Sequence, residues 1–233
     1  MNNRPFKNGL TVHNFEHPQT LAILNHFVQQ EIKLDFIIFH QKPFKRKILN
    51  LKNFLLNRNS HLKNELFEKF KNVDIYNIPN INSKEAANVF KKYAPSLVLC
   101  NTGIITKKTI NNHPDTFLLN VHGSQLPKYR GVSNLHWALW DKEDIYVSVH
   151  RINNGIDEGD ILYQEMALKN KGDLISSGKV DELINLLPFI ACKAIKKFNN
   201  NEIQFIKQDC LGEPMMQYYS MHPILQKIVN TRN

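Results

Sequence analysis

Short apolar runs alternate along this sequence with longer segments whose apolar residues recur at helical spacing. Each run has the length and β-branched character of a buried strand, and each longer segment has the period of an amphipathic helix. This alternation is typical of a parallel sheet that binds ligands at the carboxyl ends of its strands. We therefore predict an α/β fold with a Rossmann-like, mostly parallel sheet. The expected strands are Leu10–Phe15, Lys33–Phe39, Val73–Ile78, Ser96–Asn101 and Thr116–His122, and the expected helices are Leu21–Gln30, capped by Thr20, and Ser83–Tyr93, capped by Ser83.

The chain after residue 131 continues with further helical and extended patterns. The expected elements are a helix over Val132–Trp140, strands over Ile145–Ile152 and Asp160–Glu165, and a helical stretch over Leu174–Asn199 that Pro188 kinks or divides. The tail, from Glu202–Ile206 onward through Gln217–Pro223, is expected to form a strand or hairpin with a loose end. We predict one main domain over residues 1–200 and a short C-terminal helix or strand extension over residues 201–233.

Composition narrows the class of protein. The 233 residues are 42% hydrophobic, and no apolar run approaches the roughly 18 residues that cross a bilayer. The first residues lack the apolar stretch of a secretory signal. The three cysteines are far apart and lack metal-ligand spacing, so reduced thiols and no metal site are expected. Together these features predict a cytoplasmic enzyme.

The chain is basic, with a formal net charge of +9. A basic surface attracts polyanions, such as nucleic acid, a nucleotide diphosphate or a polyglutamylated cofactor. The segment from Lys42 to Lys71 concentrates this charge and could contact phosphates. It could equally be the solvated face of an amphipathic helix, so the charge alone does not select a function.

The stretch from Asn120 to Gly131 holds the strongest functional signal. It begins as a buried strand and breaks at Gly123 and Pro127 into a basic, aromatic loop. Because side chains at i and i+2 of a strand share a face, Asn120 and His122 should project together. An amide donor beside a titratable imidazole at a strand end is suited to acyl chemistry.

The pattern Asn-x-His-x-Ser-x-Leu-Pro-x-Tyr-Arg-Gly, followed about 35 residues after His122 by Asp157-Glu-Gly159, resembles the folate-dependent formyltransferases. That family includes enzymes acting on glycinamide ribonucleotide, on methionyl-tRNA and on nucleotide-linked amino sugars. The resemblance extends from about Ser96 to Gln164. It implies an enzyme that transfers a formyl group from 10-formyltetrahydrofolate to a primary amine.

The resemblance assigns roles to three residues. Asn120 would polarise the formyl oxygen, and His122 would stabilise the developing charge and assist proton transfer. Asp157 would orient His122, favour its charged form and help to deprotonate the amine. Each residue also has a structural alternative, namely a strand end, a loop hydrogen bond and a turn. The three together favour catalysis.

The resemblance also suggests where the ligands bind. The pteridine would be recognised mainly by main-chain groups of two loops, with an apolar wall beside the folate. These cofactor-binding candidates are Gly103, Ile104, Thr106, Leu126, Pro127, Asn153, Asn154 and Gly155. The substrate-binding candidates are Ser124, Lys128, Tyr129 and Arg130, and the Arg130 guanidinium could pair with a phosphate or carboxylate. Gln125 stands where the family often has Leu.

Two observations bear on the amine substrate. About 70 residues follow Gln164, fewer than the methionyl-tRNA enzymes use to grip RNA, and the glycinamide ribonucleotide enzymes' Gly-Ser-Asn phosphate loop is missing. His17 and Gln19 stand near that position, as substrate ligands or as ordinary capping residues. We therefore expect a dTDP- or UDP-linked amino sugar of surface polysaccharide synthesis. Alternatives are methionyl-tRNA, glycinamide ribonucleotide, hydrolysis of the formylated folate, and a non-catalytic nucleic-acid-binding role. A homodimer is left open.

Overall fold

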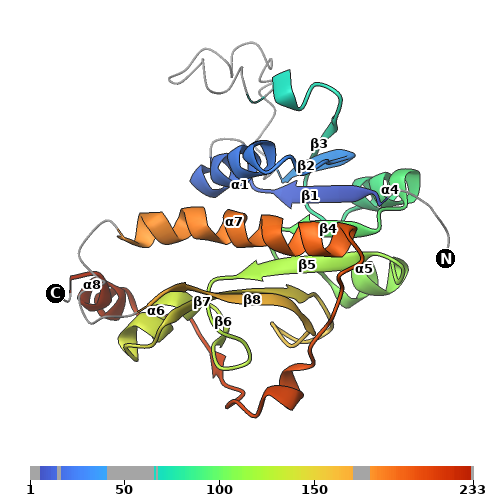
Figure 1. Ribbon diagram of the computed structural model, residues 1–233. Coiled ribbons are helices and arrows are strands. Elements are labelled where there is room, and N and C mark those ends of the chain that lie inside the picture. The colour runs from blue at the N-terminus through green and yellow to red at the C-terminus, as the bar shows by residue number, and fades with distance from the viewer. Residues whose placement is uncertain (1–5, 15–16, 41–65, 67, 170–178, 232–233) are drawn as a thin grey trace.

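Seven strands form one sheet in the order β3-β2-β1-β4-β5-β7-β8 (Figure 1). The structure, a computed structural model, describes residues 6–14, 17–40, 66, 68–169 and 179–231. The strands from β1 to β5 pair in parallel, whereas β7 and β8 are antiparallel additions. The mostly parallel α/β fold is confirmed. The strands are β1 (Asn8–Val12), β2 (Phe36–His40), β3 (Asp74–Ile78), β4 (Leu97–Cys100), β5 (Phe117–His122), β7 (Ile145–Arg151) and β8 (Ile161–Leu168).

The central parallel strands β1, β2 and β4 are buried on both faces because helices cover both sides of the sheet. In β2, Ile37 and Phe39 pack into one buried cluster and Phe36 and Ile38 into the other. Helices α1 (Pro18–Gln29) and α7 (Lys179–Asn199) supply the first cluster, and α4 (Lys84–Tyr93) supplies the second. This two-sided burial explains why these strands are continuous apolar runs rather than alternating polar and apolar sequences.

Local capping signals were predicted correctly at one helix and wrongly at another. The Ser83 side chain accepts a hydrogen bond from the N–H of Ala86, so the predicted cap of α4 is confirmed. The prediction that Thr20 caps α1 is wrong. Pro18 begins that helix, and the buried Thr20 hydroxyl donates to the carbonyl of His13 instead.

The C-terminal segment differs from the sequence prediction in two ways. Of the strand or hairpin expected between Glu202 and Pro223, the structure has a single bridge from Ile206 to Ile161 and the two-residue strand β9 (Gln217–Tyr218). The expected loose end is wrong, because α8 (Pro223–Thr231) follows that strand. Helix α7 is one helix that continues through Pro188 rather than two.

The C-terminal segment folds back onto the motif loop. Strand β9 pairs in parallel with β6 (Arg130–Gly131), and a third buried cluster joins α8 to α6 (Asn134–Trp140). Helix α5 (Lys107–Asn112) and a short 3₁₀ helix η1 (Gln208–Leu211) complete the elements described. The proposed division of the chain at residue 200 stays a prediction.

Two further expectations concern the basic segment and the absence of a membrane-spanning helix. Most of the basic segment from Lys42 to Lys71 lies outside the described residues. Among the helices that the structure describes, none combines the length and apolar character that a bilayer crossing requires.

Candidate active site

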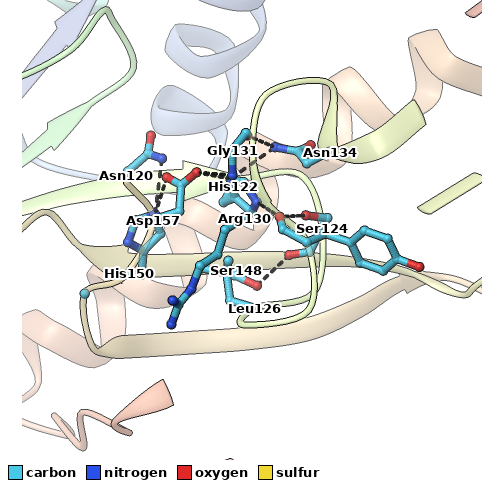
Figure 2. Close-up of polar contacts among 12 residues, drawn as sticks. Asn120, His122, Ser124, Leu126, Arg130, Gly131, Asn134, Ser148, His150 and Asp157 are labelled. Atoms are coloured by element: carbon cyan, nitrogen blue, oxygen red, sulfur yellow. Dashed lines mark hydrogen bonds and ion pairs between the residues drawn. The ribbon is translucent and has the colours of Figure 1, made fainter. Parts of the chain in front are cut away.

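Strand β5 delivers two of the three predicted catalytic residues to one place. Asn120 and His122 project from the same face of its carboxyl end, as the strand period predicts (Figure 2). The antiparallel register of β5 against β7 sets Asn120 opposite His150. The Asn120 amide Nδ2 lies 3.2 Å from Nε2 of His150, while both histidines are buried. The sheet thus assembles an amide and two imidazoles without any contribution from loop residues.

Asp157 comes to this group from the loop between β7 and β8. Its backbone is left-handed, with φ of 55°, and its Oδ2 accepts a hydrogen bond from the N–H of Gly131 at 2.8 Å. The same oxygen lies 3.6 Å from Nδ1 of His122, and Oδ1 lies 3.4 Å from Nε2 of His150. Figure 2 shows the carboxylate between the two rings. Asp157 therefore lies beside His122, and Asn120 is joined to it through His150.

The environment of Asp157 keeps its carboxyl group ionised. Burial by itself would raise the pKa of Asp157. The close approach of the His150 and His122 rings and the N–H of Gly131 outweigh burial and lower that pKa from 3.8 to about 2. The site therefore holds a negative charge at neutral pH in a mostly dehydrated position.

His122 has both ring nitrogens occupied. Nε2 lies 2.5 Å from the carbonyl oxygen of Tyr129, and Nδ1 lies 3.1 Å from the side-chain amide nitrogen of Asn134. Because a carbonyl only accepts, Nε2 carries the hydrogen and Nδ1 presents a lone pair. Burial lowers the pKa of His122 in spite of the opposing effects of Asp157 and the Tyr129 carbonyl. The ring is thus a neutral proton acceptor at Nδ1.

The two histidines and Asp157 are also of the types that bind transition metals. One atom from each of the three lies within 4.8 Å of the others. However, Nδ1 of His122 accepts from Asn134 and Nε2 of His150 faces the amide of Asn120, at 3.1 and 3.2 Å. The lone pairs that a metal would need already have hydrogen-bond donors, so a metal would have to displace both donors.

The predicted substrate residues of the motif loop are largely engaged by the protein itself. Ser124 and Tyr129 are buried, the former donating to the carbonyl of Tyr129 at 3.0 Å and the latter to Asp141 at 2.9 Å. Lys128 pairs with Glu143 at 2.9 Å. These contacts give Ser124, Lys128 and Tyr129 roles in fixing the loop. Their part in substrate binding stays a prediction.

Arg130 is held by Gln208. Its Nε and Nη2 both donate to Oε1 of Gln208, at 2.9 and 2.7 Å, and its Nη1 lies 4.0 Å from Glu158. The expected pairing of this guanidinium with a substrate anion is untested. Any such ligand would meet a side chain that Gln208 already orients.

The first predicted cofactor loop follows β4. Gly103 has φ of 51° and open space around its α-carbon, and Ile104 is 85% exposed. Asn82 holds this loop by donating to the carbonyl of Ile104 at 2.9 Å and accepting from the N–H of Thr106 at 2.8 Å. Thr106 also caps α5. The loop is therefore supported from behind while its outer surface is accessible.

The second predicted cofactor loop precedes Asp157. Asn153 and Asn154 are exposed, the N–H of Gly155 donates to Oδ1 of Asn153 at 3.1 Å, and Ile156 is 62% exposed. The apolar wall expected from Leu126 and Pro127 is buried. Their contact with a folate stays a prediction.

A small pocket on the opposite side of β5 involves none of the three predicted catalytic residues. It is lined by Gln19, Ile23, Asn101, Val121, Leu187 and Pro188. Gln19 therefore borders a cavity, whereas His17 is the N-cap of α1 without a side-chain capping bond. Neither observation assigns these two residues to a substrate.

The sequence did not predict three residues of the site. It indicated only that His150 lies in an alternating strand, that Asn134 lies in a helix and that Gln208 lies in the C-terminal tail. A histidine on the inward face of a strand was the one available signal for His150. For the other two, the contacts depend on folding between segments far apart in sequence.

Solved structures share this fold. A sugar N-formyltransferase from Shewanella aligns over 97% of this chain and 87% of its own, with 14% identity and a TM-score of 0.61. The glycinamide ribonucleotide transformylase 1 of Symbiobacterium toebii aligns over 87% and 94%, with 18% identity and a TM-score of 0.60. The N-formyltransferase of Helicobacter canadensis, solved with folinic acid and dTDP-3-aminofucose, aligns over 97% and 80%, with 17% identity and a TM-score of 0.60. At such identities the likeness establishes the fold.

Curated relatives match the chain in sequence. The methionyl-tRNA formyltransferase of Methylacidiphilum infernorum is 36% identical over 101 residues, which are 42% of this chain and 32% of that protein. The corresponding enzyme of Clostridium acetobutylicum is 31% identical over 142 residues, 60% of this chain and 44% of that protein. The matched region thus spans less than half of either relative.

The family-level comparison covers more than the motif. The formyl transferase family model matches residues 52–173, about half of the chain, and the match includes Asn120, His122 and Asp157. The motif, the fold and this match agree, and the chain belongs to the formyl transferase family.

Proposed function

We propose that this protein transfers a formyl group from 10-formyltetrahydrofolate to the primary amine of a nucleotide-linked amino sugar. The observation that carries the proposal is the convergence of Asn120, His122 and Asp157 around one position at the carboxyl end of β5. Such a convergence matches the needs of acyl transfer, because a carbonyl oxygen gains negative charge while an amine loses a proton.

Asn120 is suited to the first of these needs. One N–H of its amide is directed at Nε2 of His150, at 3.2 Å, and an amide nitrogen carries a second N–H. That second donor can bind the formyl oxygen as its charge develops, a contribution worth about 3–4 kcal/mol in comparable sites. His150 acts here as the support that orients the amide.

His122 and Asp157 are suited to the second need. Nε2 of His122 is committed to the Tyr129 carbonyl, so Nδ1 receives the proton of the attacking amine. Once Nδ1 is protonated, the ionised Asp157 at 3.6 Å stabilises the imidazolium. The ring then carries a positive charge at the moment when the formyl oxygen is negative.

Bound 10-formyltetrahydrofolate would supply the formyl carbon attached to a nitrogen leaving group. Two exposed loops support this cofactor, since Ile104 and Ile156 are 85% and 62% exposed beside main-chain groups that could bind a pteridine. Membership of the family and the folinic acid named for the Helicobacter canadensis enzyme agree with this choice.

The amino-sugar nucleotide is favoured as the substrate because the sugar enzymes align with nearly all of this chain, including its C-terminal segment. Sugar N-formyltransferases align over 97–99% of this chain, whereas three glycinamide ribonucleotide enzymes align over 83–93%. That segment pairs with the motif loop through β6 and β9. The net charge of +9 would attract a nucleotide diphosphate. Methionyl-tRNA is the second candidate, because the curated relatives cited above are methionyl-tRNA formyltransferases.

The test is a panel of amines incubated with 10-formyltetrahydrofolate. The panel holds dTDP- and UDP-linked 3-amino and 4-amino sugars, methionyl-tRNA and glycinamide ribonucleotide, and mass spectrometry detects the formylated product. We expect transfer to an amino-sugar nucleotide, and a loss of at least about 100-fold in kcat for His122→Ala and Asp157→Asn. Lys91→Ala, an exposed position on α4, is the control and should behave as the wild type.

Each other result has a distinct meaning. Formylation of methionyl-tRNA or glycinamide ribonucleotide alone would replace the sugar substrate. Release of formate without any formylated amine would identify a hydrolase. An unchanged rate in His122→Ala would remove the proposed mechanism.

A further inference from the structure

Asn134, the first residue of α6, holds a fixed orientation beside His122. Its side-chain oxygen accepts a hydrogen bond from the N–H of Leu135 at 2.6 Å. Its amide nitrogen lies 3.1 Å from Nδ1 of His122 and 3.4 Å from the carbonyl of Gly131 (Figure 2). If the oxygen and nitrogen of this amide were exchanged, its N–H would face the N–H of Leu135 and its oxygen would face the carbonyl oxygen of Gly131. The amide group therefore presents donors, and only donors, to His122.

This orientation assigns the hydrogens of the imidazole. A donor from Asn134 requires a lone pair at Nδ1, so the ring hydrogen is at Nε2. At Nε2 the ring meets the carbonyl of Tyr129, 2.5 Å away, to which the Ser124 hydroxyl also donates. Both ends of the ring thus specify the same neutral tautomer.

We propose that Asn134 is a positioning residue that holds His122 as the Nε2–H tautomer, so that Nδ1 is the nitrogen that takes the proton of the substrate amine once the Asn134 N–H gives way. The inference assumes the role of His122 in the function proposed above. Apart from the substrate amine and the formyl donor of that function, it needs no group other than those already in the site.

Asn134 and Asp157 act on the same nitrogen in opposite directions. Among the residues that the structure describes, the titratable groups facing His122 are Asp157, with Oδ2 3.6 Å from Nδ1, and His150, with its ring centroid 6.1 Å away. Asp157 favours a proton at Nδ1, whereas Asn134 would then point an N–H at an N–H. The imidazolium is therefore stabilised enough to form and destabilised enough to pass its proton to the nitrogen that the formyl group leaves.

The experiment reads the tautomer and titration of His122 by ¹⁵N NMR of the full chain with labelled histidine. The resonances of His122 are assigned from a His122→Gln sample. In the wild type at neutral pH, Nε2 should be protonated and Nδ1 should not. Asn134→Ala removes the donor, and the titration midpoint should rise by roughly one pH unit, the size expected for one lost hydrogen bond to the neutral form.

A second variant tests the direction of the effect. Asn134→Asp keeps an oxygen for the N–H of Leu135 but replaces the donor at Nδ1 by a carboxylate, so the midpoint should rise further. The limb of the pH profile of kcat/KM that reports His122 should move the same way. Asn112→Ala, an exposed residue of α5, should leave the midpoint unchanged.

The inference is overturned if both Asn134 variants, folded by circular dichroism, keep the wild-type tautomer and midpoint. The NMR readout needs no substrate, so this result is distinct from failure of the proposed function. Shifted midpoints without formylation of any amine would uphold the role of Asn134 and refute the activity. Formylation of an amine by a protein whose Asn134 variants show unshifted midpoints would uphold the activity and refute the role of Asn134.

Discussion

Gln208 joins three segments that are far apart in the sequence. It is 3% exposed, and its Nε2 donates to the carbonyls of Asp157 and Gly159, both at 2.8 Å. Its Oε1 accepts from Nε and Nη2 of Arg130. One side chain of the C-terminal segment thus fixes both the motif loop and the loop that carries Asp157.

Replacing Gln208 by Ala removes all four hydrogen bonds at once. Two are neutral and worth about 1 kcal/mol each, and the two from the guanidinium share one acceptor and together contribute about 2 kcal/mol. We therefore expect the free energy of unfolding to fall by about 3–5 kcal/mol, a large part of the usual stability of a domain. Asp157 should lose its fixed left-handed backbone, so formyl transfer should fall as well.

Urea unfolding followed by circular dichroism measures the effect. The midpoint should fall while the slope of free energy against urea stays constant, which indicates a change in stability alone. Gln29→Ala, an exposed position at the end of α1, is the matched control and should stay within about 0.5 kcal/mol of the wild type. A Gln208→Ala protein that loses less than about 1 kcal/mol would refute the reasoning.

Three other perturbations have definite expected outcomes. Gly159→Ala would place a β-carbon 1.8 Å from the carbonyl oxygen of Arg151, so urea unfolding should show a loss of about 1–3 kcal/mol. A thiol reagent should modify the exposed Cys210 in the native protein, while the other two thiols, whose pKa burial raises to about 12, should react only after unfolding. The Asp157 pKa falls from 3.8 to about 2 on folding, so the unfolded chain binds more protons between those values. Stability that depends on Asp157, about 2–3 kcal/mol, should be present above pH 4 and lost as the pH falls through 2. The difference in urea midpoint between wild type and Asp157→Asn should shrink over that range, and a constant difference would contradict the pKa.

Much of the fold could be predicted from the sequence because it depends on residues that are near neighbours in the chain. Apolar runs such as Phe36–His40 must be buried on both faces, and Ser83 caps α4 with its own side chain. The tail helix could also have been found, since Leu225 and Val229 are four residues apart and face the core behind Pro223. The Thr20 prediction failed because a proline two residues earlier starts the helix.

The motif identified Asn120, His122 and Asp157 because residue type and spacing alone predict their chemistry. The residues that orient them cannot be predicted in that way. His150 reaches Asn120 only through the register of β5 against β7, and Asn134 reaches His122 only when α6 folds back over the strand end. Side-chain identity thus specifies which groups can react, whereas hydrogen-bond register and the packing of distant segments decide which nitrogen is the base, because those contacts exist only after the chain has folded.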